Sequence, residues 1–403
     1  MNKASAATST SAVAPGKSHY VVLDGLRGVA SLLVIVFHLF ETFTNDDPTR
    51  QIINHGYLAV DFFFLLSGFV IAYAYDDRWD RMNQWGFYKR RLIRLQPMVV
   101  LGSVIGAALF YFQAGSVFPS ISVTPVWQVL LVMLLGCTLL PLPKALDIRG
   151  WNELHPLNGP AWSLFYEYLA NIGYAVFFRR LSIRALAGLV VMAAAFLLEV
   201  ALLGERRDLI GGWSLDLAGL HVGFARLLYP FLAGMLLMRV GKRIRSRHAF
   251  ALSSVLLIAA LSVPRLGDTP HHWSNGLYDA LCVILLFPLI VAIGAGEKRV
   301  DGTSVKIARF FGDLSFPLYI THYPLIYLYT AWVAEHHPAP LEATIGGVIV
   351  FVAAVSIAFG SLKLYDEPVR RWLSARFLQP ASTIKSTADV TAAIPAIQKE
   401  QTD

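Results

Sequence analysis

Charged residues are scarce in this sequence. Asp, Glu, Lys and Arg make up 15% of its 403 residues, whereas soluble domains carry roughly a quarter. The hydrophobic fraction is 56% and the mean hydropathy is +0.54. This composition excludes an ordinary soluble domain. Apolar runs of roughly 20 residues recur along the chain, each about long enough to cross a ~30 Å hydrocarbon layer, so we expect the membrane to be the solvent of the fold.

Several common catalytic and metal-binding patterns are missing. The two cysteines, Cys137 and Cys282, lie inside apolar runs, so we expect neither a disulfide framework nor a cysteine metal site. The sequence has no Walker loop, G-x-G-x-x-G, H-E-x-x-H or G-x-S-x-G pattern. We therefore expect no metal. The net charge of +7 fits loop residues that face a cytoplasm, and we expect no nucleic-acid partner.

The apolar runs and the loop charges together predict the topology. Eleven runs lie near 21–43, 57–75, 96–114, 125–142, 161–178, 183–203, 218–238, 248–264, 277–295, 313–334 and 342–364. If ten of them cross, five connections carry 21 Lys and Arg and the opposite five carry six. The positive-inside rule then places both termini in the cytoplasm. This asymmetry requires that 125–142, which is followed closely by Pro143, is re-entrant or interfacial.

The sequence thus predicts an all-α polytopic membrane protein with about ten transmembrane helices and a re-entrant or interfacial segment near 125–142. We expect one membrane domain at 20–376, between disordered cytoplasmic tails at 1–19 and 377–403 that are rich in Ser, Thr, Ala and Lys. The first run ends without a small-x-small cleavage site, so we expect a retained helix and not a signal peptide.

Few ionisable residues lie inside the apolar runs. Such groups cost several kcal/mol in a membrane helix and are functional candidates by default. They are Asp24, Arg27, His38, Asp61, Glu167, Arg226 and His322.

Arg27 and His38 share one face of the first predicted helix. They are eleven residues apart, which returns almost to the same angle about 16 Å along the axis. This face therefore carries a fixed cation near one membrane surface and a titratable base nearer the other. A catalytic pair and a plain structural interpretation, with Arg27 snorkelling to lipid phosphates and His38 packed, both fit this spacing. Glu41 lies three residues beyond His38 and could orient its ring.

Two further segments carry candidate groups. Ser163 and Glu167 are one helical turn apart. The topology places Glu167 at about the depth of His38, where the two could share proton transfer, or Glu167 could form a structural hydrogen bond with a His or an Arg. Arg91 and Arg94 are three residues apart and could bind phosphates as a pair, although an ordinary positive-inside flank looks the same.

Six motifs occur in order between about residues 20 and 375. They are Tyr20-Val-Val-Leu-Asp-Gly-Leu-Arg27 with His38, Asp61-Phe-Phe-Phe-Leu-Leu-Ser67-Gly68, Arg91-x-x-Arg94, Trp162-Ser163-Leu-Phe-Tyr-Glu167, Leu314-Ser315-Phe-Pro-Leu-Tyr319-Ile-Thr-His322-Tyr-Pro324, and Tyr365-Asp-Glu367-Pro368. This series resembles the type-3 membrane acyltransferase family, the integral-membrane O-acyltransferases of bacterial surface polysaccharides, Nod factors and macrolides.

The resemblance implies a reaction and roles for these residues. It implies transfer of an acyl group, most often acetyl, from cytoplasmic acyl-CoA to a hydroxyl of a cell-surface or exported saccharide, free or lipid-linked, at a bacterial plasma membrane. We expect His38 to act as general base or acyl carrier with Glu167 assisting, and Arg91, Arg94 and Arg27 to bind CoA. The expected substrate or tunnel residues are Asp24, Asp61, Ser67, Trp162, Ser163, Arg226, Tyr319 and His322.

Two alternatives stay open on the sequence. O-acylation of a small-molecule natural product would use the same motifs and differ only in the acceptor. A proton-coupled glycan or lipid transporter would use His38 and Glu167 as a relay, but paired broken helices in two related halves are not evident. Dependence on acyl-CoA separates the transporter from both acyltransferases.

Overall fold

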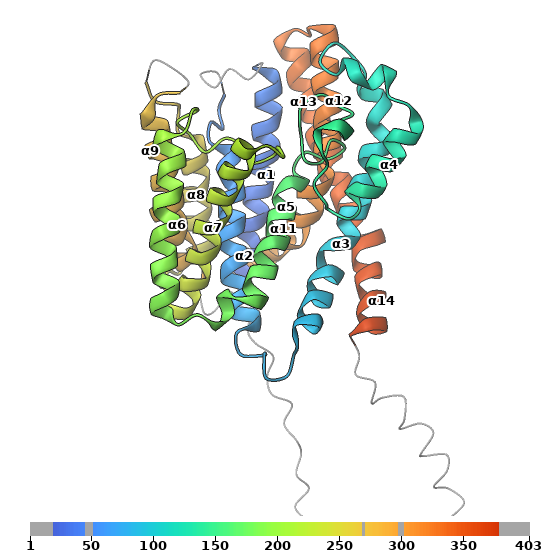
Figure 1. The fold of residues 1–403 in the computed structure, drawn as a ribbon. Coiled ribbons are helices and arrows are strands. Elements are labelled where there is room, and N and C mark those ends of the chain that lie inside the picture. Colours follow the sequence, from blue (N-terminus) through green and yellow to red (C-terminus); the bar gives the residue numbers. More distant parts are fainter. Residues whose placement is uncertain (1–18, 45–50, 268–270, 297–301, 379–403) are drawn as a thin grey trace, which may run out of the picture.

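The computed structural model describes residues 19–44, 51–267, 271–296 and 302–378, and these ranges contain helices but no strands. Figure 1 shows a bundle whose helices run mostly along one axis. The tails expected at 1–19 and 377–403 lie outside the described residues, apart from His19, Phe377 and Leu378.

Ten helical passes make up the bundle within the described ranges, and the expected all-α polytopic fold is confirmed. Seven of them are long and apolar enough to cross a membrane. The passes are α1 (Val21–Phe43), α2 (Ala59–Tyr75), α3 (Gln84–Leu109), α5 (Ala161–Val176), α6 (Ile183–Leu203), α7 (Leu217–Val240), α8 (Ala249–Ser262), α9 with α10 (Trp273–Leu281 and Phe287–Gly294), α11 with α12 (Thr303–Thr321 and Tyr323–His336), and α13 (Pro340–Ser361).

The segment 125–142 does not form a full crossing. Its helix α4 (Val126–Gly136) has 11 residues, about 16 Å of helix, which is roughly half of a hydrocarbon layer. Pro125 precedes the helix and fixes its start, and the chain leaves helical geometry after Cys137. In Figure 1, α4 lies at the side of the bundle beside α3.

Glycines let the central helices approach closely. A Cβ at Gly28 of α1 would lie 2.3 Å from the carbonyl oxygen of Phe311 in α11. A Cβ at Gly68 of α2 would lie 2.0 Å from that of Phe231 in α7. Because no side chain fits in these gaps, backbones meet directly, as is typical of small residues at membrane helix interfaces. These contacts fix α1 against α11 and α2 against α7.

Regular α-helical geometry is interrupted at His322 and at the segment Leu362–Asp366. His322 separates α11 from α12, and Pro324 follows it as an early residue of α12. The π-helical segment η7 (Leu362–Asp366) joins α13 to α14 (Glu367–Phe377). Such π-helical insertions occur frequently at functional sites.

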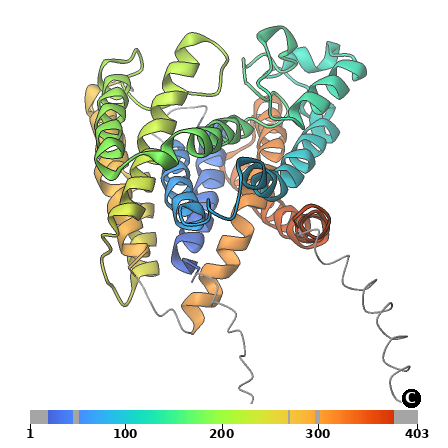
Figure 2. The same cartoon turned by 60° about the horizontal axis from the view of Figure 1, so that its bottom comes forward.

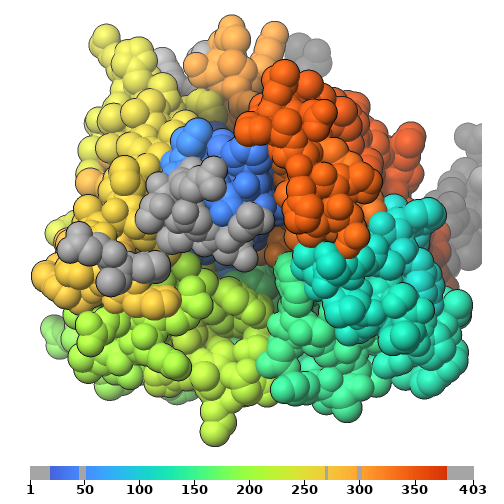
Figure 3. Space-filling model, turned by 90° about the horizontal axis from the view of Figure 1, so that it is seen from above, coloured from blue at the N-terminus to red at the C-terminus, as the bar shows by residue number. Residues whose placement is uncertain are grey.

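The two ends of the bundle differ in charge. At one end, called here the basic end, α1 begins and α14 ends, and the Arg- and Lys-rich connection between α7 and α8 lies there as well. Figure 2 brings this end forward and shows the start of α1 beside α11, with α3 and α14 nearby. Figure 3 shows the opposite end, where α1 lies at the centre of a rim of surrounding helices.

Candidate active site

A cavity of about 580 Å³ opens at the basic end of the bundle. It lies between α1, α3, α11, η7 and α14, and its walls are unusually rich in charged side chains. The charged and titratable lining residues are His19, Asp24, Arg27, Arg94, Arg309, Asp313, Asp366, Glu367, Arg370 and Arg371.

The arginines of this cavity are only partly neutralised. Arg370 pairs with Asp366 at 2.8 Å, and Arg27 lies 4.0 Å from Asp24, which also pairs with His19 at 2.9 Å. That hydrogen bond with Asp24 raises the pKa of His19 above its ordinary value.

Three other cavity arginines have no carboxylate at ion-pair distance within the described ranges. They are Arg94, Arg309 and Arg371. Unpaired guanidinium groups in a cavity of this size suit a ligand with several phosphates, because each can bind a phosphate with two hydrogen bonds.

His38 forms a carboxylate–imidazole pair with Glu41 near the other end of α1. The distance from Nδ1 of His38 to Oε2 of Glu41 is 2.7 Å. A carboxylate accepts, so Nδ1 carries the hydrogen and Nε2 keeps a free lone pair. No described residue hydrogen-bonds to that Nε2, and the side chain retains 18% of its surface exposed. The sequence spacing had suggested that Glu41 orients His38, and the structure shows this contact.

His322 lies against His38 at the break between α11 and α12. The two rings stack with centroids 5.9 Å apart and planes 26° apart. Tyr323 packs edge-on to His38, with 4.8 Å between centroids. His322 is fully buried, and its Nδ1 lies 3.1 Å from the carbonyl oxygen of Leu318 and 2.9 Å from that of Tyr319.

Arg27 and His38 share one face of α1, as their spacing predicts, and in the structure this face lies against α11. Between them, Ser31 donates a hydrogen bond to the carbonyl oxygen of Ser315 at 3.0 Å. Arg27 lines the cavity, and His38 lies eleven residues further along α1, about 16 Å by helical rise. One seam between two parallel helices therefore connects the basic cavity to the histidine pair.

Glu167 belongs to a different cluster from His38. Its Oε1 accepts hydrogen bonds from Arg91 at 2.5 Å and from Ser67 at 3.1 Å. Within the described ranges the structure shows no hydrogen bond or ion pair between Glu167 and His38, and Arg91 is not among the cavity residues. Arg91 and Arg94 are thus divided, one holding α5 and the other facing the cavity.

Arg226 and Asp61 form a buried ion pair in the half of the bundle away from the basic end. Arg226 Nη2 lies 2.7 Å from Asp61 Oδ2, and both side chains are almost completely buried. The same guanidinium stacks over Trp162, 5.2 Å from the ring centroid. This pair secures α7 to α2.

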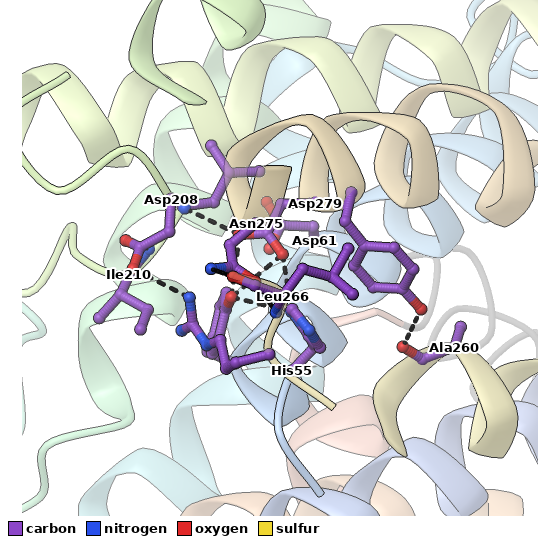
Figure 4. Close-up of polar contacts among 12 residues, drawn as sticks. His55, Asp61, Asp208, Ile210, Ala260, Leu266, Asn275 and Asp279 are labelled. Atoms are coloured by element: carbon purple, nitrogen blue, oxygen red, sulfur yellow. Dashed lines mark hydrogen bonds and ion pairs between the residues drawn. The ribbon is translucent and has the colours of Figure 1, made fainter. Parts of the chain in front are cut away.

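Next to that pair lies an extensive polar network. Figure 4 shows His55, Asp279 and Asp208 among its members. His55 Nδ1 is 2.8 Å from Asp279, and Tyr57 donates to Asp279 at 2.9 Å. Asp61, Arg226 and Trp162 therefore belong to a dense polar network, and within the described ranges none of them makes a hydrogen bond, ion pair or ring contact with His38.

Ser163 and Tyr319 meet between α5 and α11. Their hydroxyl oxygens lie 2.8 Å apart, and Tyr319 also lies 3.3 Å from the carbonyl oxygen of Pro160. Phe63 packs edge-on to the Tyr319 ring, with 5.4 Å between centroids. Tyr319 thereby links the start of α5 to the last turn of α11, which His322 follows.

Three cavity arginines are not among the site residues predicted from the sequence. Arg309, Arg370 and Arg371 line the cavity, but in the sequence they look like ordinary positive-inside flanks. Among the described residues, no group of three or more His, Cys, Asp or Glu side chains is arranged to hold a metal ion.

Comparison with known proteins decides the family. The model of the acyltransferase domain family known as acyltransferase 3 matches residues 20–359. The chain belongs to the acyltransferase 3 family. It is an O-acyltransferase, and its apolar helices make it a multi-pass membrane protein.

Individual relatives agree with this membership. The acyltransferase is 26% identical over 388 residues to acyltransferase MdmB of Streptomyces mycarofaciens, an alignment that covers 91% of this chain and 95% of the relative. It is 35% identical over 193 residues to protein 2 in the picA locus of Rhizobium radiobacter, covering 45% of this chain and 94% of the relative. No solved structure matches it significantly. The family match ends before α14, so two of the cavity arginines lie outside it.

Proposed function

We propose that this acyltransferase moves an acyl group, most simply acetyl, from cytoplasmic acyl-CoA to a hydroxyl of a cell-surface or exported saccharide. The observation that carries the proposal is the seam between α1 and α11, with an arginine-lined cavity at one end and the His38–Glu41 pair at the other. The organisms of the relatives named above are bacteria, which supports a bacterial plasma membrane as its location.

The cavity is the proposed donor site. Lys- and Arg-rich connections cluster at the same end of the bundle, and the positive-inside rule assigns that end, with both termini, to the cytoplasm. Acyl-CoA is present in that compartment. Arg27, Arg94, Arg309, Arg370 and Arg371 would bind its phosphates, and the pantetheine arm would reach along α1 toward His38. Arg91, for which the resemblance implies CoA binding, pairs with Glu167 and does not line this cavity, and its contact with CoA stays a prediction.

His38 supplies the proposed chemistry. Its Nε2 removes the proton of the acceptor hydroxyl, and the oxygen attacks the thioester carbonyl carbon. The carbon–sulfur bond breaks, and the CoA thiolate leaves and takes the proton back from the imidazolium. Glu41 stabilises that imidazolium through Nδ1. General base catalysis of this kind contributes roughly 10²–10⁴-fold, and direct transfer needs no group beyond these residues and the two substrates.

The test is the O-acyl content of the surface glycan in a deletion strain. Complementation with wild type should restore an O-acyl signal in the proton NMR spectrum, and His38→Ala at equal membrane levels should not. If deletion leaves every surface O-acyl group unchanged, the saccharide acceptor is wrong, and transfer to small molecules is tested next. If the purified protein never consumes acyl-CoA, the donor assignment fails and a transport role gains support.

A further inference from the structure

One buried nitrogen of the stacked His38–His322 pair has no partner among the described residues. Nε2 of His322 makes no hydrogen bond to any described residue and has no contact with solvent. The residue is fully buried. An unsatisfied buried polar atom costs free energy that a folded protein normally avoids, so it calls for an explanation such as a ligand.

The other ring nitrogen fixes the protonation of His322. Nδ1 faces two carbonyl oxygens, those of Leu318 and Tyr319, and carbonyl oxygens only accept. Nδ1 therefore carries the hydrogen, and in the neutral ring Nε2 is an acceptor only. His322 in this state cannot donate to an oxyanion. It can bind a group that brings its own hydrogen, such as a hydroxyl.

His38 offers a second free acceptor close by. Its Nδ1 is occupied by Glu41, and its ring stacks on that of His322 at 5.9 Å between centroids. Two stacked imidazoles, each held through Nδ1, therefore each keep an Nε2 lone pair without a partner among the described residues. A single hydroxyl has one hydrogen and cannot serve both. Two hydroxyl groups on neighbouring carbons can.

We propose that His322 is a specificity-determining residue whose Nε2 accepts a hydrogen bond from a second acceptor hydroxyl, adjacent to the one that His38 deprotonates. The site then selects vicinal diols such as those of a sugar ring. The inference rests on the proposed acyl transfer and adds the class of acceptor. A site built to bind a substrate hydroxyl rejects analogues that lack it far more strongly than an apolar pocket rejects an extra methylene.

Two substitutions separate this role from a structural one. Asn at 322 places an N–H near the position of Nδ1 and can still donate to the carbonyl oxygens of Leu318 and Tyr319. It has no hydrogen-bond acceptor at the position of Nε2. Gln at 322 places an oxygen near Nε2 and loses the Nδ1 contact. If the role of His322 is structural, His322→Asn should keep more activity than His322→Gln. If His322 binds the acceptor, His322→Gln should keep more activity than His322→Asn.

The first experiment measures transfer of label from radiolabelled acetyl-CoA to endogenous acceptor in membranes that hold equal amounts of each protein. We expect His322→Gln to keep transfer within about tenfold of wild type and His322→Asn to lose roughly 100-fold or more, with the KM for acetyl-CoA unchanged in both. The reverse order, or equal losses, would overturn the proposal. If wild-type membranes transfer no label, the proposed function itself fails, which is a different result.

The second experiment maps the product. The acylated position in the wild-type product is assigned by proton NMR, from the shift of the acylated carbon's hydrogen and its coupling to the next carbon. We expect a hydroxyl on a carbon adjacent to the acylated one. An acyl group whose neighbouring carbons carry no hydroxyl would overturn the diol requirement while leaving acyl transfer intact.

Discussion

The guanidinium of Arg91 in α3 lies 2.5 Å from the carboxylate of Glu167 in α5, and Ser67 of α2 donates to the same oxygen. Three helices therefore meet at one carboxylate. The side chain of Arg91 is 8% exposed and that of Glu167 is 19% exposed. Because both charges are mostly removed from water, each is stabilised mainly by the other. This contact holds the helix that carries Arg94 in place beside the arginine-lined cavity.

Replacing only one member of this ion pair should destabilise the protein more than replacing both members. Arg91→Met leaves a buried carboxylate without its cation, which costs about 3 kcal/mol for a well-buried pair and somewhat less here. The double variant Arg91→Met with Glu167→Leu should recover most of that loss. Thermal unfolding in detergent measures both. Equal melting temperatures for the single and double variants would show that the two charges are not coupled.

Arg94 should control the affinity for the donor. It lines the cavity and has no carboxylate at ion-pair distance among the described residues. Arg94→Ala should therefore raise the KM for acetyl-CoA about tenfold or more, because a charge-assisted phosphate contact contributes roughly 1.5–3 kcal/mol. Arg180→Ala is the matched control, since Arg180 is exposed and does not line the cavity. A similar rise in both variants would indicate a general charge effect and not a site.

Glu41 should matter through its charge. Glu41→Gln can still accept the hydrogen bond from Nδ1 of His38 but cannot balance an imidazolium, so kcat should fall at least about tenfold with little change in the KM for acetyl-CoA. Initial rates at saturating donor check this. A full rate in Glu41→Gln would mean that the 2.7 Å contact only orients the ring.

Glu153 should make stability depend on pH. It lies in the loop between α4 and α5, where burial raises the pKa of its carboxyl to about 7, against the opposing effect of Arg149. Between its ordinary pKa of about 4.5 and 7, the unfolded chain has lost this proton while the folded protein keeps it, so this group's contribution to stability falls as the pH rises through that window.

Glu153→Gln removes the titrating group and keeps a similar shape. Its melting temperature should therefore fall less than that of wild type between pH 4.5 and 7. Parallel curves for the two proteins across this range would exclude Glu153 as the source of the dependence.

Local patterns explain which features the sequence revealed. Helix passes follow from hydropathy, and the short α4 follows from proline and from the balance of loop charges, both of which can be read along the chain. The His38–Glu41 contact spans three residues of one helix, so its spacing is visible in the sequence. These features depend on neighbours in the chain and not on the packing of the bundle.

Contacts between helices that are far apart in the sequence could not be predicted from local patterns. Arg91 and Glu167 are 76 residues apart, and Asp61 and Arg226 are 165 apart. Nothing local distinguishes a cation that binds a ligand from one that pairs with a carboxylate on another helix. The sequence therefore identified the polar residues but could not divide them between the arginine-lined cavity, the His38–His322 pair and the structural ion pairs. Those roles of the residues stay predictions.

The most direct test of the account is acetyl transfer by protein in which only His38 is changed. Membranes with equal amounts of wild type and His38→Ala are given radiolabelled acetyl-CoA, and label in the acceptor is followed over time. We expect label in the wild-type sample and a loss of roughly 100-fold or more in His38→Ala. Equal labelling by the two proteins would contradict the assignment of His38 as the base.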